Sequence, residues 1–353
     1  MNLYLPSGYF NFKKVRHFAI KHNIKFVYIA GGRGTGKTYG AIDSYMFDEP
    51  EPFIWIRRTQ AQTDIINKPE YNPFKKNAKA HGTAICMSPI SQYNAGIYRA
   101  AEGADKPTPE GPALGYTAAL STFSNIRGFD ADDMQAILFD EFIPEVHERP
   151  IKNEAEAFFN AYETINRNRE LEDPPRPPVT AFCLANSNDL GNPIFLYAGH
   201  VQTCLNMRKK GQDVYIDFNR HYMIILLDES PISKMKETTV LYEYLGRDTD
   251  FVEMSLGNVF HGEKDIRVIS RPLKEYEPVV TAGELTIYRH KGGQLSHYCT
   301  FHRSGSGPRY GGSDTELKRF ASKYAWLWLA YMRDRLEFED YGAELLFQKY
   351  FKY

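Results

Sequence analysis

The sequence predicts an α/β protein: a P-loop domain built on a parallel sheet, then a linker and a small α+β domain. Three observations support this prediction. Residues 31–38 form a glycine-rich loop between an apolar run and a helical pattern. Residues 136–139 form a second apolar run, which is followed by two carboxylates. From about residue 264, short strand-like runs alternate with glycine turns.

The glycine-rich loop Gly31-Gly32-Arg33-Gly34-Thr35-Gly36-Lys37-Thr38 fits the pattern G-x-x-x-x-G-K-[ST]. Residues 25–30 before it predict a buried strand, and residues 39–46 after it predict a helix. Such a loop turns consecutive N–H groups toward one anion, and the helix N-terminus adds positive charge. We expect Lys37 to reach the β- and γ-phosphates of ATP and Thr38 to ligate Mg²⁺. The alternative is a glycine-rich turn without a ligand.

In the stretch Gln135–Glu141, four apolar residues (136–139) are followed by Asp140 and Glu141, which is the Walker B pattern. A strand that is buried on both faces must be apolar along its length. Its end would bring Asp140 beside the P-loop, where Asp140 would hold the Mg²⁺ shell. Glu141 would then polarise the attacking water, with Glu145 as the other carboxylate to test.

The remaining elements of the first domain follow in order. Residues 13–20 predict a helix, and 53–58 predict a strand that closes on Arg57 and Arg58. This arginine pair would lie where ligands of open α/β sheets bind, or simply at the surface. Residues 59–81 predict a helix broken at Pro69. Residues 82–120 predict short strands and turns, including a long polar loop at 101–112.

Residues 153–169 predict a helix that ends with Arg167 and Arg169, and 179–185 predict another buried strand. Asn186 or Ser187, which follow this strand, would sense the γ-phosphate or would merely end the strand. Residues 213–229 predict a hairpin around residues 219–221. The boundaries that we expect are 1–228 for the P-loop domain, 229–262 for the linker and 263–353 for the C-terminal domain.

In the C-terminal domain we expect strands at 267–273, 278–280, 284–290 and 294–301, and a loose loop at 303–312. One long helix would follow from about Thr315. The four cysteines are far apart, which fits a reducing compartment and no zinc site. No run of about 20 apolar residues occurs, so we expect no transmembrane helix, and the first residues do not resemble a secretory signal.

The formal net charge of −1 hides a division along the chain. Residues 1–100 contain 14 Lys and Arg against 6 Asp and Glu, whereas residues 101–175 contain 6 against 16. Such a division is compatible with one basic face for nucleic acid and equally with ordinary solvated faces.

Several phrases resemble the DNA-packaging ATPases (encapsidation proteins) of phi-29-type podoviruses. The Arg-Asn-Arg-Glu phrase at 167–170 and the Ser-Leu-Gly-Asn phrase at 255–258 are the most specific. The other phrases are Gly31–Gly34, Arg57-Arg58, Phe139–Ile143 and Cys183–Asn186, while Ser124–Phe129 resembles the wider terminase group. The acidic stretch 130–133 and the loop 101–112 depart from that family.

The resemblance implies an ATP-driven motor that moves double-stranded DNA into a preformed capsid, acting as a homopentamer on the portal vertex in the host cytoplasm. It implies an ASCE-type sheet, in which the 179–185 strand lies between the Walker A and Walker B strands. It gives Arg167 the role of a finger that acts on the neighbouring subunit, with Lys37 and Glu141 as the other catalytic residues. It also implies an RNase H-like C-terminal domain without nuclease carboxylates, consistent with the lack of acidic residues at 278–281, and leaves open a structural RNA partner.

Two other functions stay open at this point. One is a P-loop ATPase with another cargo, such as a helicase loader or a filamentous-phage assembly ATPase, although the latter usually carries a membrane span. The other is a nucleotide-binding switch with little hydrolysis, against which Glu141 argues. DNA contacts are expected among residues 57–79 and 99–127, mainly to phosphates.

Overall fold

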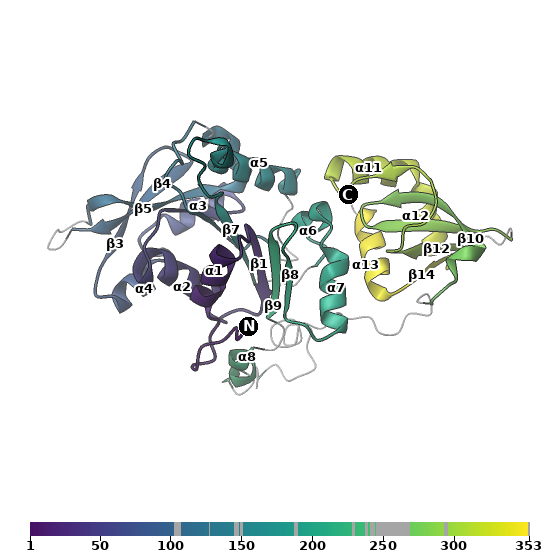
Figure 1. The fold of residues 1–353 in the computed structure, drawn as a ribbon, viewed down its shortest axis with the longest axis horizontal. Helices are drawn as coiled ribbons and strands as arrows, with labels where there is room; N and C mark the ends of the chain where they lie inside the picture. The colour runs from purple at the N-terminus through teal and green to yellow at the C-terminus, as the bar shows by residue number, and fades with distance from the viewer. Residues whose placement is uncertain are drawn as a thin grey trace. The chain divides into compact units, whose positions relative to one another are not determined.

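The chain forms two compact units in a computed structural model (Figure 1). The structure describes residues 1–101, 107–126, 128–144, 148, 151–186, 190–227, 230–236, 239–240, 244, 269–292 and 296–351. The first unit contains residues 1–151, 157–188 and 213–259, and the second contains residues 152–156, 189–212 and 260–353.

The first unit is built on a nine-stranded sheet with the order β3-β4-β5-β2-β6-β7-β1-β9-β8. The six strands from β5 to β9 in this order are parallel, and antiparallel strands lie at both edges. The bounds are β1 Phe26–Gly31, β2 Phe53–Arg57, β3 Ile85–Pro89, β4 Asn94–Ala100, β5 Pro109–Ala119, β6 Ala136–Asp140, β7 Thr180–Ala185, β8 Val214–Asp217 and β9 Tyr222–Leu227. Strand β7 lies between β6 and β1, which confirms the predicted ASCE-type order, and β8–β9 is the predicted hairpin.

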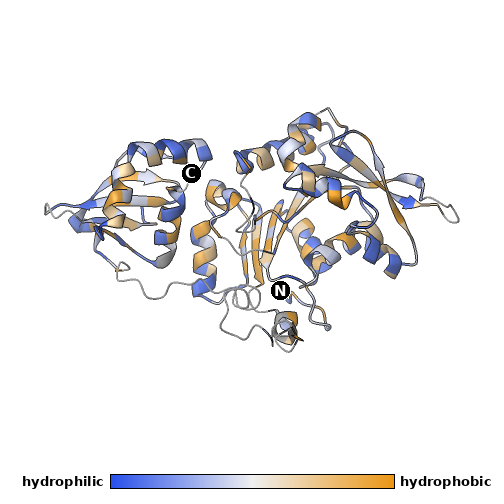
Figure 2. Ribbon diagram, turned by 180° about the vertical axis from the view of Figure 1, so that it is seen from behind, coloured by the Kyte–Doolittle hydropathy of each residue, from blue (hydrophilic) through white to orange (hydrophobic). Residues whose placement is uncertain are grey.

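The central strands are apolar along almost their whole length because both faces of the sheet are covered. All five residues of β6 and all six of β7 and β9 are buried. Figure 2 shows these strands as the most hydrophobic part of the unit. Cys183, in the middle of β7, lies opposite Phe139 on one side and Tyr28 on the other.

The helices of the first unit are α1 Phe12–Lys21, α2 Lys37–Asp43, α3 Gln60–Ile66, α4 Lys75–Ala80, α5 Glu154–Asn166 and α8 Pro231–Lys236. The helix predicted to Arg169 is too long, because α5 ends at Asn166. Arg167 and Asn168 have φ values of 45° and 58°, which an α-helix does not allow. The polar loop predicted at 101–112 is also too long, because β5 begins at Pro109 and pairs there with β4.

The second unit has a five-stranded sheet with the order β13-β10-β11-β12-β14. Its strands are β10 Tyr276–Ala282, β11 Leu285–His290, β12 His297–Thr300, β13 Arg309–Tyr310 and β14 Leu336–Phe338. Its helices are α6 Pro193–Ala198, α7 Val201–Lys209, α11 Asp314–Lys323, α12 Ala325–Met332 and α13 Tyr341–Tyr350. Antiparallel pairing joins β10, β11 and β12, which confirms a small α+β domain at the C-terminus.

Two predictions for this unit are wrong. The single long helix from Thr315 is instead α11, α12, β14 and α13. The chain turns at Asp334, whose φ is 55°, and Leu336 and Phe338 then bury themselves at the edge of the sheet. The strand predicted at 267–273 does not form in its described part. Pro272 lacks an N–H, and a 3-10 turn follows at Leu273–Glu275.

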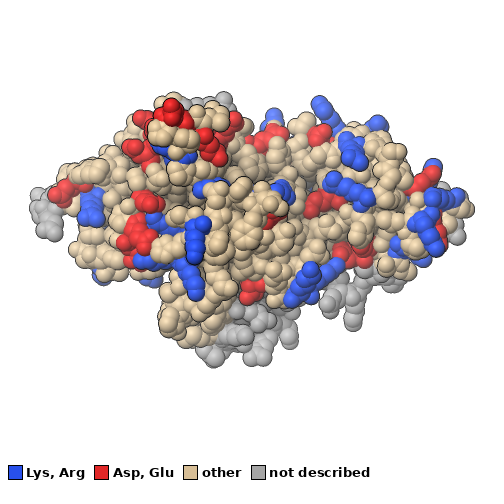
Figure 3. All heavy atoms as spheres, in the orientation of Figure 1, with Lys and Arg blue, Asp and Glu red and all other residues tan. Residues whose placement is uncertain are grey.

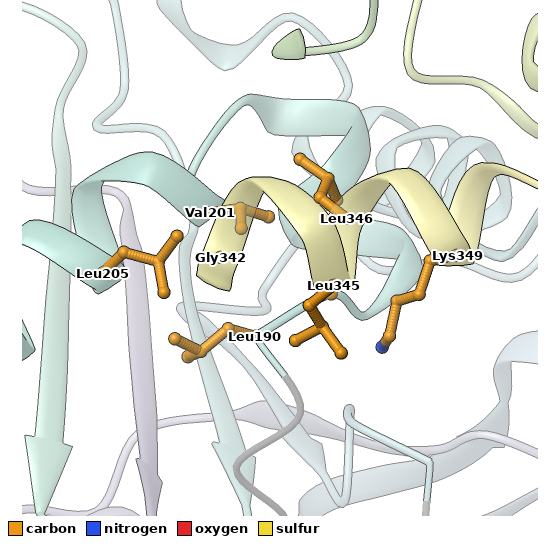
Figure 4. A pocket seen from close by; sticks show the side chains of 8 residues that line it. Leu190, Val201, Leu205, Gly342, Leu345, Leu346 and Lys349 are labelled. Carbon is orange, nitrogen blue, oxygen red and sulfur yellow. The ribbon is translucent and has the colours of Figure 1, made fainter. Parts of the chain in front are cut away.

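Helices α6 and α7 group with the second unit, whereas the predicted boundary placed them in the first domain. Apolar side chains of α7 and α13 meet around a small hollow (Figure 4), to which Val201, Leu205, Leu345 and Leu346 contribute. The Glu284 carboxylate accepts hydrogen bonds from the N–H groups of Val201 and Gln202, at 3.1 and 3.0 Å. Most of the predicted linker 229–262, including the phrase at 253–260, lies outside the described residues.

Candidate active site

The P-loop connects β1 to α2 through backbone conformations that require glycine. Gly36 has a φ of 93°, and a Cβ there would lie 3.2 Å from the Tyr9 ring. A Cβ on Gly31 would lie 2.5 Å from the Cβ of Leu227 on the neighbouring strand β9. The glycines of the motif therefore serve the curl of the loop and its close packing on the sheet. Arg33 lies on the exposed part of the loop.

The side chain of Lys37 is folded into the loop. Its Nζ donates to the carbonyl oxygens of Gly31 and Gly32, at 2.9 and 2.8 Å, and to Thr35 Oγ1, at 3.0 Å. Only 3% of Lys37 is exposed. The loop thus holds one positive charge at the point where the N–H groups of the P-loop and the start of α2 converge.

Strand β6 ends beside this loop and brings its carboxylates to the same place. Thr38 Oγ1 donates a hydrogen bond of 3.0 Å to Asp140 Oδ1. Burial raises the pKa of the Asp140 carboxyl, while the nearby Arg57 guanidinium and the Thr38 hydroxyl act in the opposite direction. Glu141 follows with a φ of 57°, an uncommon backbone conformation for a residue other than glycine.

Arg57 completes this group of charges. Its Nη1 lies 3.1 Å from Asp140 Oδ2 and 2.7 Å from Glu141 Oε2. These are ion pairs by distance, although the N–H directions do not align as hydrogen bonds. From its sequence position alone, Arg57 could have lain at the site or at the surface. The only sequence signal that Arg57 belongs to the site was its place at the end of an apolar strand. The structure shows that Arg57 lies at the site and not at the surface.

The next residue, Arg58, points elsewhere because successive side chains alternate across a strand. It is completely buried, and its Nη1 donates to Glu148 at 2.8 Å. Gln62 on α3 also donates to this carboxylate, at 2.8 Å. Arg58 therefore ties the chain after β6 to α3, and only Arg57 of the pair belongs to the site.

Two further candidates have different positions. Asn186 directly follows β7, between the strands that carry the P-loop and the Walker B residues, and is half-buried. The alternatives Ser187 and Glu145 lie outside the described residues. Arg167 does not reach this edge of the sheet. Its Nη2 donates to the Phe129 carbonyl at 2.6 Å, and its Nη1 lies 3.7 Å from the exposed Asp130.

The position of Arg167 follows from that of its neighbour Arg169. The buried Arg169 donates to the carbonyls of Met134, Ala131 and Asp132, at 2.6, 3.1 and 2.6 Å. Met134 precedes β6, and Asp140 ends it, so about 20 Å of strand separates the two at roughly 3.3 Å per residue. Arg167 thus lies at the amino ends of the parallel strands, which we call the amino edge of the sheet. The P-loop of the same chain lies at their carboxyl ends, the carboxyl edge.

The residues at the P-loop fit a Mg²⁺–nucleotide complex. Thr38 and Asp140 offer the hydroxyl and carboxylate oxygens that Mg²⁺ takes together with phosphate oxygens and water. Among the residues that the structure describes, no group of three His, Cys, Asp or Glu could hold a metal ion on its own. Also within those residues, no helix is long and apolar enough to cross a membrane.

The fold and this geometry define a P-loop nucleotide-binding domain of the ASCE type with a second, α+β unit. A family model described as podovirus DNA encapsidation protein (Gp16) matches residues 110–284. The match contains β6, Arg167 and β7 but not the P-loop, so it is independent of that motif. It confirms the resemblance to the encapsidation proteins over about half of the chain.

Solved structures of packaging motors have the same fold. The bacteriophage phi-29 viral genome packaging motor assembly is similar at 17% identity, with 98% of each chain covered and a TM-score of 0.56. The phi-28 gp11 DNA packaging motor is similar at 17% identity, with 95% of each chain covered and a TM-score of 0.54. At these identities the likeness shows the fold alone, for almost the whole chain. No curated protein matches the sequence.

Proposed function

We propose that this chain is an ATPase that drives double-stranded viral DNA into a preformed capsid. The observation that carries the proposal is the meeting of Lys37, Thr38, Asp140 and Glu141 at the carboxyl edge of an ASCE-type sheet. The match to the encapsidation proteins supports DNA as the cargo. The proteins with the same fold are described as packaging motors.

At the P-loop, Lys37 would exchange its bonds to the loop carbonyls for the β- and γ-phosphates of ATP. A bound Mg²⁺ would supply positive charge to the phosphates, and Thr38 and Asp140 would hold it. Glu141 would orient and polarise the attacking water, and Asn186 would contact the γ-phosphate. Arg57 now neutralises both carboxylates, so we expect it to shift when the nucleotide binds.

Arg167 would act on the ATP of the neighbouring subunit. Its position at the far edge of the sheet supports this role, because it cannot reach the P-loop of its own chain. An arginine supplied in trans stabilises the charge that develops on the γ-phosphate, and contributes about 10³–10⁵ in rate. Hydrolysis would then depend on the contact between subunits, which couples the chemistry to their movement.

The remaining proposals follow from the resemblance. The chain would work as a homopentamer on the portal vertex in the host cytoplasm, with a structural RNA as a further candidate partner. DNA would be held mainly through its phosphates, because a motor must move any sequence. Residues 57–79 remain candidates for this contact; part of the second candidate range, 99–127, lies outside the described residues. The RNase H-like domain would dock on the capsid rather than cleave DNA.

The test is the ATPase activity of the full chain, measured alone, with double-stranded DNA, and with both DNA and procapsids. We expect stimulation that is largest when all components are present, together with protection of the DNA from added nuclease. Activity that responds to single-stranded DNA and a helicase, but not to procapsids, would favour another cargo. The absence of any hydrolysis would favour a nucleotide-binding switch.

A further inference from the structure

The surface around Arg167 combines an exposed apolar side chain with many acidic ones. Leu171 is 83% exposed, more than most large apolar residues of the chain. We call this the α5-end surface, and it consists of Arg167, Leu171 and the exposed acidic residues Asp130, Asp132, Asp133, Glu170 and Asp173. Figure 3 shows acidic side chains gathered over the end of α5. These residues account for much of the acidic excess of residues 101–175.

Hydrogen bonds from Arg169 and Arg176 fix the backbone segments that form this surface. Arg169 binds three carbonyls of the 131–134 segment. Arg176 donates to Asp132 Oδ1 at 3.1 Å and also pairs with Glu172, which ties the segment after α5 to the segment before β6. The left-handed backbone at Arg167 and Asn168 sets the direction of the finger. A surface that is already ordered loses little entropy when it binds a partner.

A surface of opposite charge lies near the P-loop of the same unit. Lys76 Nζ lies 5.6 Å from the centre of the Tyr39 ring, and Tyr39 is two residues after Lys37. Asn77 Nδ2 donates to the Tyr39 carbonyl at 3.0 Å, which fixes α4 beside the start of α2. We call this the α4 surface. It consists of Lys68, Lys75, Lys76 and Lys79 with the exposed rings of Tyr39 and Tyr71, and these four lysines outweigh the exposed Glu70 among them.

We propose that the α5-end surface of one copy of this chain docks on the α4 surface of the next copy. The inference rests on the proposed function, because it supplies the contact through which Arg167 reaches the P-loop of the neighbour. The charges are complementary, and Leu171 would pack against the tyrosine rings of the partner. Two different surfaces of the same unit make a head-to-tail contact, and such contacts close into rings when the rotation allows.

The acidic charges favour a second copy over DNA as the partner of the α5-end surface, because phosphates would be repelled there. The α4 surface by itself would suit either DNA or an acidic protein surface. The match in charge with a surface on the same chain favours the second copy, so within the candidate DNA range 57–79 we assign these lysines to the contact between subunits. The contact also explains why the acidic and basic excesses lie in separate segments although the net charge is only −1.

The test reverses each surface in the full-length chain. One variant carries Asp133→Lys and Glu170→Lys, a second carries Lys75→Glu and Lys76→Glu, and a third carries all four. The controls are Glu275→Lys and Lys14→Glu, which change exposed residues outside both surfaces. Self-association is measured by sedimentation velocity with Mg²⁺ and ATPγS at low and high salt, and folding by circular dichroism.

We expect each two-residue reversal to weaken association about tenfold or more at low salt, because like charges then face each other. The variant with all four changes should recover, since its charges are exchanged, and the controls should match the wild type. Unchanged association after reversal of the α5-end surface, or no recovery in the four-residue variant, would overturn the proposal. Loss of DNA binding with normal association in the Lys75/Lys76 variant would also overturn it, and would assign the α4 surface to DNA. If the wild type associated in this charge-dependent way but hydrolysed no ATP, the motor proposal would fail and the interface would stand.

Discussion

The carboxyl edge and the amino edge of the nine-stranded sheet, where the parallel strands end and begin, carry different kinds of site. At the carboxyl edge, Arg57 of β2 contacts Asp140 and Glu141, and Thr38 joins Asp140 to the P-loop, which holds Lys37. At the amino edge, Arg167 contacts a backbone carbonyl and an exposed carboxylate. Under the proposed function, one chain supplies the residues that hold the nucleotide, whereas Arg167 acts on the nucleotide of a second chain.

Within the amino edge, two arginines only two positions apart have different roles. Arg169 is buried and donates to three carbonyls, so it holds the segments together. Arg167 lies at the surface, with 38% of its side chain exposed. The end of α5 at Asn166 causes this difference, because the left-handed residues that follow turn the two side chains in different directions.

The largest effects are expected at the carboxyl edge. Lys37→Ala removes the buried charge of the P-loop, so nucleotide binding should be lost. Glu141→Gln should still bind Mg²⁺ and ATP but lose about 10²–10⁴ in turnover, because it cannot polarise water. Fluorescent-nucleotide binding and phosphate release measure the two effects separately. Wild-type turnover in Glu141→Gln would disprove the assignment of the base and direct attention to Glu145.

The finger should be as important for turnover but not for binding. Arg167→Ala should bind ATP normally and lose about 10³-fold in hydrolysis when subunits assemble on procapsids. Mixing it with Glu141→Gln should restore part of the activity, since some Arg167→Ala sites then receive an intact finger from a neighbour. If the mixture stayed inactive and Arg167→Ala bound ATP poorly, Arg167 would belong to its own subunit's site or to the fold.

Substitutions of the two arginines should differ in their effect on the free energy of unfolding. Arg169→Met leaves three carbonyls without their donor, which should lower the free energy of unfolding by about 3 kcal/mol. Arg167→Met should change it by no more than about 0.5 kcal/mol, as for other surface positions. Chemical denaturation of both variants measures the difference. Equal stabilities would mean that Arg169 is not the structural member of the pair.

The smallest effect concerns Lys25, which directly precedes β1 at the amino edge of the sheet. Burial lowers the pKa of Lys25 from its ordinary value of 10.5, and the nearby Glu170 carboxylate partly reverses this. A lysine whose pKa is lower in the folded state than in the unfolded chain reduces the free energy of unfolding at pH values where it is charged. This reduction disappears as the pH rises to the pKa of the unfolded chain. Glu170→Gln lowers the pKa further. It should therefore destabilise by less than about 1 kcal/mol at neutral pH and match the wild type above pH 10.5 in thermal unfolding. A difference that persisted at alkaline pH would have another cause.

Sequence patterns alone were enough to predict the fold class, the P-loop, the Walker B strand, a buried strand at 179–185 and the order of the two units; the place of that strand between the Walker A and Walker B strands came from the resemblance. These features are local or follow from burial: the loop needs glycines at particular positions, and a strand covered on both faces must be apolar. The resemblance to the encapsidation proteins also rests on local features, because a few short phrases of the chain were enough to state it.

The three-dimensional arrangement was needed to show which of Arg57 and Arg58 faces the site, at which edge Arg167 lies, and that α6 and α7 group with the C-terminal unit. It was also needed to show that the apolar C-terminal pattern breaks into α11, α12, β14 and α13 rather than one helix. The physical reason is common to these cases. Each depends on which distant segment supplies the partner: Asp140 and Glu141 for Arg57, the 131–134 carbonyls for Arg169, α13 for α7, and the edge of β12 for β14. A contact between segments far apart in the chain leaves no periodic trace in either of them.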